Sequence, residues 1–290
     1  MKRSTLVATV FALLFGSSLT ATADEKVDKV AKDLDGRFAK IDSYTAKTES
    51  MIDSQFGPNH AQKSKIVGTM AWVRKGAKIL MRNEMKDQTV KTEDGKTTET
   101  TSDILMVSDG EFLYSLSEVE GKKFVTKSFA PSAKDSSPSA MFNQLKAYYD
   151  IKLLPDETVD GDDCYVFEMK MKPMEGVPPS GRQVSYYQKK TGISIKNEGF
   201  DADGKLTHSS IMKDLKINAN VSDDSFKFEI PEGAQVSDMT KQQQQQQPPD
   251  EQVEPKEEPQ AEQPKEEKEE PKKPEKKKKK KKLFDVPKLP

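Results

Sequence analysis

The stretch "GTMAWVRKGAKILMR", residues 68 to 82, decides how this chain folds. Apolar side chains alternate with other residues on both sides of a Lys-Gly pair, so the spacing predicts two strands joined by a tight turn. Met70 and Trp72 share one side of the first strand, and Ile79 and Met81 share one side of the second. Such a hairpin faces either a closed core or an apolar cavity, and periodicity alone does not decide between them.

The same period of two continues along most of the chain, which predicts a body made of β-sheet. Sequential hairpins indicate an antiparallel meander of about 9 to 11 strands, ending with "SFKFEIP" at 225 to 231. The polar stretch 87 to 102 has no apolar side chains at regular spacing to anchor it and is predicted to be a loop. The hairpin turns are predicted at six glycines and the residues before them: Asp94-Gly95, Asp109-Gly110, Glu120-Gly121, Asp160-Gly161, Thr191-Gly192 and Asp203-Gly204.

Two segments have helical spacing instead. Residues 25 to 41 place apolar side chains at steps of three and four, which predicts an amphipathic helix. Residues 137 to 149 begin with Ser-Pro and repeat apolar residues at similar steps, which predicts a short helix inserted between hairpins. The predicted fold is mainly β with two helices.

The first 23 residues have the composition of a secretory signal peptide. Lys2 and Arg3 precede a short apolar run, and small residues end at Ala23, so we expect cleavage near Ala23 and export of the chain. Residues 24 to 240 are long enough for one domain with a sizeable core. The single cysteine cannot form an internal disulfide, so this core must hold without one.

The last segment, residues 241 to 290, has the Gln, Pro, Glu and Lys composition of a disordered tail. Its charges are segregated: residues 250 to 270 carry ten acidic side chains and three lysines, and residues 272 to 282 carry nine lysines and one glutamate. The tail is either a solubilising spacer or a contact to anionic membrane or envelope polymer. A nucleic-acid partner is not expected, because no aromatic residues alternate with the lysines.

Few side chains are available for catalysis. The chain has two histidines, His60 and His208, and one thiol, Cys164, which lies in a predicted strand where a lone cysteine usually acts as a small apolar residue. No Cys or His spacing typical of a metal site occurs, and no glycine-rich phosphate loop. We therefore expect neither an enzyme nor a bound cofactor or metal.

Three short motifs, in order, resemble the periplasmic outer-membrane lipoprotein carrier family, the LolA-like lipoprotein-sorting proteins. They are a G-x-x-x-W-V-basic strand containing Trp72, an S-D-G turn at 108 to 110 followed by Leu113 and Tyr114, and a closing F-x-F-x-x-P-x-G from Phe226 to Gly233. The resemblance covers residues 24 to 240.

The resemblance implies an incomplete, strongly curved antiparallel β-barrel whose two helices form a lid. It implies a periplasmic, non-catalytic and monomeric carrier or chaperone of lipoprotein acyl chains or related lipids. Its partners would be an inner-membrane transporter and an outer-membrane acceptor. The expected cavity lining is Met70, Trp72, Ile79, Met81, Met106, Phe112 and Tyr114.

In that family an arginine after the Trp-Val pair holds the lid closed. Aligning Trp72 places Lys75 at this position, whereas aligning Gly68 places Arg74 there, so both are candidates for the latch. Two rival functions remain: an envelope stress sensor of the same fold that binds lipoprotein and a protein partner, and a secreted hydrolase using His208 or Cys164.

Overall fold

The computed structural model describes residues 23–55, 57, 59–173 and 181–241. All of the described residues belong to one compact unit. Most of the predicted signal peptide and of the predicted tail lies outside the described residues. Within the described part, no helix is both long enough and apolar enough to cross a bilayer.

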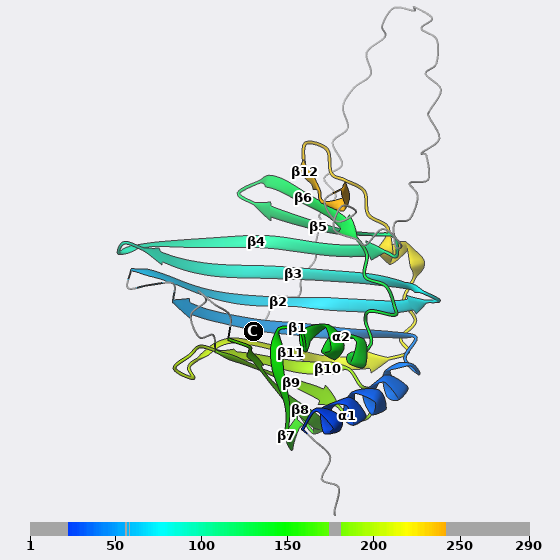
Figure 1. Cartoon of the computed structure of the whole chain (residues 1–290). Helices are drawn as coiled ribbons and strands as arrows, with labels where there is room; N and C mark the ends of the chain where they lie inside the picture. Colours follow the sequence, from blue (N-terminus) through cyan, green and yellow to red (C-terminus); the bar gives the residue numbers. More distant parts are fainter. Residues whose placement is uncertain (1–22, 56, 58, 174–180, 242–290) are drawn as a thin grey trace, which may run out of the picture. The chain divides into compact units, whose positions relative to one another are not determined.

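Twelve strands form one open, strongly curved sheet in the order β12-β6-β5-β4-β3-β2-β1-β11-β10-β9-β8-β7 (Figure 1). Neighbouring strands are antiparallel except β12, which runs parallel to β6. This confirms the predicted fold class, an incomplete barrel with an N-terminal helix and a short inserted helix. The strands are β1 (Ser43–Gln55), β2 (His60–Lys75), β3 (Lys78–Glu93), β4 (Lys96–Asp109), β5 (Phe112–Val119), β6 (Lys122–Phe129), β7 (Tyr149–Val159), β8 (Asp162–Met171), β9 (Arg182–Gln188), β10 (Ser194–Phe200), β11 (Leu206–Ile217) and β12 (Gln235–Asp238).

The two predicted helices are present, as α1 (Ala23–Phe38) and α2 (Pro138–Leu145). Helix α2 begins as the Ser-Pro signal predicts, because the hydroxyl of Ser137 accepts a hydrogen bond from the backbone N–H of Ala140 at 3.3 Å. A 3₁₀ helix, η1 (Asp223–Phe226), follows the last long strand.

The predicted glycine turns explain the hairpins. Asp94 and Gly95 both have positive φ, 48° and 78°, and join β3 to β4. A two-residue turn with positive φ at both positions matches the right-handed twist of the strands on either side. Glu120-Gly121 repeats this geometry between β5 and β6.

The prediction of a loop at residues 87 to 102 is wrong. Strands β3 and β4 continue through it, and their pairing extends to Glu93 and Lys96. The segment is rich in threonine, a β-branched residue that favours extended backbone. It lacks an apolar alternation because its side chains are largely exposed or half-buried on both faces of the sheet.

The described residues contain two hydrophobic clusters. One joins Phe38 and Ile41, at the end of α1, to Tyr44 and Trp72 on the sheet and to apolar side chains of β8 to β10. The other packs both helices on β7 to β9. Its buried members are Val27, Ala31, Leu34, Phe142, Ile151, Phe167, Met169 and Tyr187.

The predicted last strand at 225 to 231 is also wrong. Phe226 belongs to η1 and is buried, whereas Ile230 is 49% exposed in irregular backbone. The ring of Phe228 stacks on Tyr114 at 4.7 Å between centroids. The alternation of phenylalanines therefore serves to hold a covering segment on the sheet rather than to extend it.

Candidate functional site

Strand pairing defines the face of the sheet on which the helices pack. Trp72 lies opposite Tyr44 on β1, and further along the same face of β1, Ser50 lies opposite Ser210. This face continues through β10 and β9 to Phe167 on β8, whose ring packs against Phe142 of α2 at 4.5 Å. We call it the helix face, and the other side the opposite face.

The helix face is closed around Trp72. The Trp72 ring stacks on Tyr44 at 5.2 Å and lies 5.3 Å from Phe38 at the end of α1. Trp72 is only 5% exposed and Ile79 only 2%. Burial raises the pKa of Tyr44 to about 12. These side chains form ordinary closed core in this structure.

Beyond this closed end, the helix face continues as four half-buried methionines, Met70, Met81, Met85 and Met106, which we call the methionine strip. In the strand register, Met70 lies opposite Asn83, and Asn83 lies opposite Met106. Methionine is unbranched and polarizable, so a row of half-buried methionines forms a surface that adapts to an irregular apolar ligand.

The structure does not bring all seven predicted lining residues together. Met70, Trp72, Ile79, Met81 and Met106 share the helix face, whereas Phe112 and Tyr114 lie on the opposite face. Their side of β5 follows from the register, in which Met106 lies opposite Ser115 and Val107 opposite Tyr114. Period-two spacing within one strand does not reveal this, because the turn between strands sets which residues share a face.

On the opposite face, Phe112 and Tyr114 belong to an aromatic group. Phe112 stacks on Phe129 at 5.9 Å and lies beneath the ammonium of Lys127 at 3.8 Å from its ring centroid. Tyr114 is covered by Phe228, as described above. The stacking of Phe228 on Tyr114 holds the C-terminal covering segment, residues 219 to 238, against the sheet.

Arg74 and Lys75 point to different faces and hold different segments. The Arg74 guanidinium donates to the carbonyl oxygens of Phe38 at 3.1 Å and Ala39 at 3.3 Å, at the C-terminal end of α1. It also lies over the rings of Phe38 and Trp72, at 4.9 and 5.3 Å. A cation is favourable there because the last carbonyls of a helix lack intrahelical partners. Lys75 instead forms an ion pair with Asp223 of η1.

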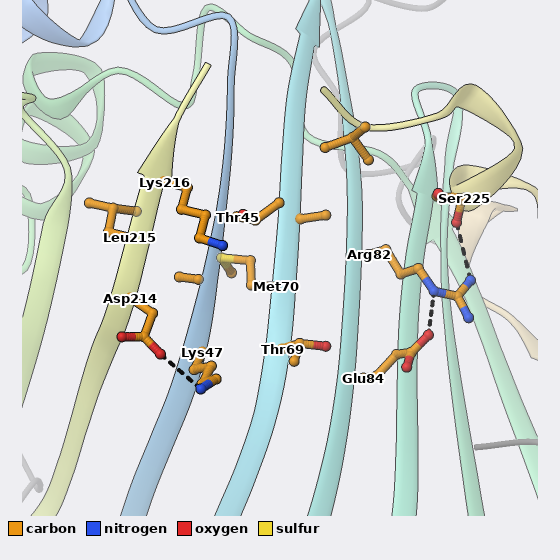
Figure 2. A pocket seen from close by; sticks show the side chains of 13 residues that line it. Thr45, Lys47, Thr69, Met70, Arg82, Glu84, Asp214, Leu215, Lys216 and Ser225 are labelled. Atoms are coloured by element: carbon orange, nitrogen blue, oxygen red, sulfur yellow. Dashed lines mark hydrogen bonds and ion pairs between the residues drawn. The ribbon is translucent and has the colours of Figure 1, made fainter. Parts of the chain in front are cut away.

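The opposite face carries an open cavity of about 850 Å³ (Figure 2). It lies between β11, β1, β2 and β3 and the start of the covering segment. Ion pairs lie on both sides of it, Lys47 with Asp214 at 2.8 Å and Arg82 with Glu84 at 2.6 Å. Met70 is the predicted site residue among those around this cavity, although the strand register directs its side chain to the helix face. The charged rim of the cavity differs from the apolar character expected of an acyl-chain site.

The residues of the hydrolase hypothesis lie apart. His208 and Cys164 occupy opposite faces, because His208 shares its face with Met169 through β10 and β9, and Cys164 lies five residues before Met169 on β8. Burial, reinforced by the charge of Asp162, raises the pKa of the Cys164 thiol to about 11. A thiol with such a pKa is a poor nucleophile near neutral pH. Among the described residues, no group of three or more His, Cys, Asp or Glu side chains gathers to hold a metal ion.

No family model matches the chain. A relative, the uncharacterised protein MJ0687 of Methanocaldococcus jannaschii, is 26% identical over 136 residues, which are 46% of this chain and 38% of that protein. The match therefore spans less than half the length of this relative.

Several solved structures are similar to the chain. An uncharacterised conserved protein of Thermus thermophilus is 10% identical, with a TM-score of 0.44 over 73% of this chain and 99% of that one. The match to the MucA/MucB complex of Pseudomonas aeruginosa is 13% identical, with a TM-score of 0.33 over 70% of this chain and 61% of that one. A domain described as an outer membrane lipoprotein-sorting protein of Vibrio parahaemolyticus is 15% identical, with a TM-score of 0.32 over 71% of this chain and 97% of that one. Lipoprotein-sorting proteins are thus among the similar structures, but TM-scores below 0.5 assign no ligand to this chain.

Proposed function

We propose that this protein binds the acyl chains of lipids or lipoproteins on the helix face, without making or breaking a covalent bond. The observation that carries the proposal is the continuity of this face. A closed end around Trp72, held under α1 by Arg74, passes directly into the half-buried methionine strip. The bound chain would lie on the strip and extend towards Trp72 when α1 moves aside.

The energetics suit reversible binding. Each methylene group withdrawn from water contributes about 0.8 kcal/mol, so a few methylene groups on the strip give useful affinity without a charged anchor. Arg74 makes two charge-assisted hydrogen bonds to α1, each contributing roughly 1.5 to 3 kcal/mol at most. A latch of that strength opens under the binding free energy of one acyl chain. Phe112 and Tyr114 are not part of the proposed site, because they face the other way.

We further propose that the protein works in the periplasm after removal of residues 1–23, with residues 24–240 as the binding domain. A donor in the inner membrane and an acceptor in the outer membrane would complete a carrier cycle. The segregated charges of residues 241–290 also favour a contact with anionic membrane, envelope polymer or a protein, which suits a sensor as well as a carrier. Deleting residues 242–290 would distinguish the carrier function from the sensor function. A carrier without the tail still transfers acyl chains, whereas a sensor without the tail no longer binds its protein partner.

The test is native mass spectrometry of the full chain purified from the periplasm of an expression host. We expect a lipid or lipoprotein adduct that is lost in a Met81→Asp, Met106→Asp double variant. Met51→Asp is the matched control, because Met51 is a 60% exposed methionine on the opposite face of β1. The proposal fails if the wild-type chain carries no acyl ligand, or if the control loses the adduct equally.

A further inference from the structure

One polar side chain lies in the middle of the methionine strip. Asn83 is at the centre of β3 and is flanked on its own strand by Met81 and Met85. The register places Met70 of β2 on one side of it and Met106 of β4 on the other. Four methionines therefore surround a single carboxamide on the helix face.

The carboxamide is only half satisfied. Its Nδ2 donates to the sulfur of Met81 at 3.9 Å. A thioether sulfur accepts hydrogen bonds but has none to donate, so the nitrogen is the end of the amide that belongs beside it. The oxygen, Oδ1, is buried and has no hydrogen-bond partner among the described residues.

A buried acceptor without a partner destabilises the folded protein, and an apolar side chain of similar volume would avoid that cost. Leucine or methionine at position 83 would continue the methionine strip without leaving a buried hydrogen-bond acceptor unpaired. Packing therefore gives no reason for asparagine at this position. An unpartnered polar group among the apolar side chains of a binding surface is typical of a site that recognises a polar group of its ligand.

We infer that Asn83 Oδ1 accepts a hydrogen bond from the bound ligand, and that the ligand is an acyl chain carrying a donor, an amide N–H or a hydroxyl, next to its apolar part. This inference rests on the proposed function and narrows it. Simple esters and hydrocarbons have no such donor. They would bind to the methionines but leave the oxygen unpaired, so the strip discriminates among ligands of equal apolar area.

Matched probes test this. N-methyldodecanamide and methyl dodecanoate differ at one group, an N–H against an ester oxygen, and methyl 3-hydroxydodecanoate supplies a hydroxyl donor instead. We expect the full chain to bind the amide, the hydroxy ester or both roughly fivefold more tightly than the plain ester, the effect of one net hydrogen bond. Which of the two is preferred distinguishes an N-acylated ligand from a hydroxylated one.

Asn83→Leu should bind all three probes alike, with the plain ester bound at least as tightly as by the wild type. Its midpoint of urea unfolding should not fall, because an unpaired acceptor has been removed. Asn83→Met serves as a second variant of similar shape. The control is Asn197→Leu: Asn197 lies on the helix face at β10, but its Oδ1 accepts from Ser185 at 2.7 Å. This variant should lose stability and keep the probe preference.

The inference is overturned if the wild type binds the three probes equally, or if Asn83→Leu and Asn83→Met keep the preference. Those results leave the proposed function intact, since the probes still bind. Failure of the wild type to bind any of the three would instead contradict the proposed function itself.

Discussion

The two ends of the helix face have similar apolar residues and opposite accessibility. At the closed end, Trp72 and Ile79 are almost fully buried beneath the last turn of α1. Directly beside it on the same face, Met81, which lies opposite Trp72 in the register, and Met106 stay half-buried. The difference is set by what covers the sheet, since both helices pack towards β7 to β9. Composition alone therefore does not distinguish a core from a binding surface; the position of the helices does.

The largest expected effect lies at the closed end. Trp72→Ala removes a buried ring packed between Phe38 and Tyr44, and should lower the free energy of unfolding by roughly 3 to 5 kcal/mol. Urea unfolding followed by circular dichroism measures this. A loss below about 1 kcal/mol, within the usual range of a surface substitution, would mean that this end is not core.

The pH dependence of stability sharpens the same distinction. Tyr44 has an ordinary pKa of 10.0 when exposed and about 12 when buried. Its contribution to stability is complete below pH 10, and is lost as pH rises towards 12, by about 1.4 kcal/mol per pH unit, because the unfolded state releases the proton first. Comparing wild type with Tyr44→Phe isolates this group. Equal slopes of stability against pH above 10 in both proteins would show that Tyr44 is not desolvated.

At the open end the balance between stability and binding should reverse. Met106→Asp places a charge on a half-buried surface, so we expect at least about tenfold weaker binding of a fatty-acyl probe, or 1.4 kcal/mol. The free energy of unfolding should change by less than that. Isothermal titration calorimetry measures the affinity for the probe, and urea unfolding measures the free energy of unfolding. Equal losses of stability and binding would make the strip part of the core.

The smallest expected effect concerns the boundary between the two ends. Arg74→Lys keeps a positive charge but loses the forked donor geometry that reaches two carbonyl oxygens of α1. Losing one net hydrogen bond should increase opening of α1 about fivefold. Amide hydrogen exchange in residues 30–38 measures this opening. Lys75→Ala is the control and should leave the exchange of α1 unchanged, because Lys75 contacts η1.

Much of the fold could be predicted from local chemistry. Steps of three and four predicted α1, the Ser-Pro start predicted α2, and turns such as Asp94-Gly95 predicted the hairpins, because these signals act within a few residues. The strand predicted at 225 to 231 failed because alternating phenylalanines also suit an irregular segment that packs on a sheet. An alternating pattern indicates which side chains are buried, but it does not indicate whether the backbone forms hydrogen bonds with a neighbouring strand.

The site could be predicted only in part. Spacing identified Met70, Met81 and Met106 as apolar strand residues, but the turn before β5 placed Phe112 and Tyr114 on the other face. Asn83 was missed, although a polar residue between Met81 and Met85 at alternating positions is a visible signal in the sequence. Its importance depends on which strands pair with β3, and that register is a property of the whole sheet.

An open sheet also has two edges, and these decide how the protein behaves in a crowded compartment. One outermost strand, β12, is only four residues long, and the other, β7, has an irregularity between Leu154 and Glu157 around Pro155. Short, interrupted or proline-containing edges do not template pairing with another chain. The barrel can thus stay unclosed, with room for a ligand, and we expect it to remain a monomer without growing by strand addition into aggregates.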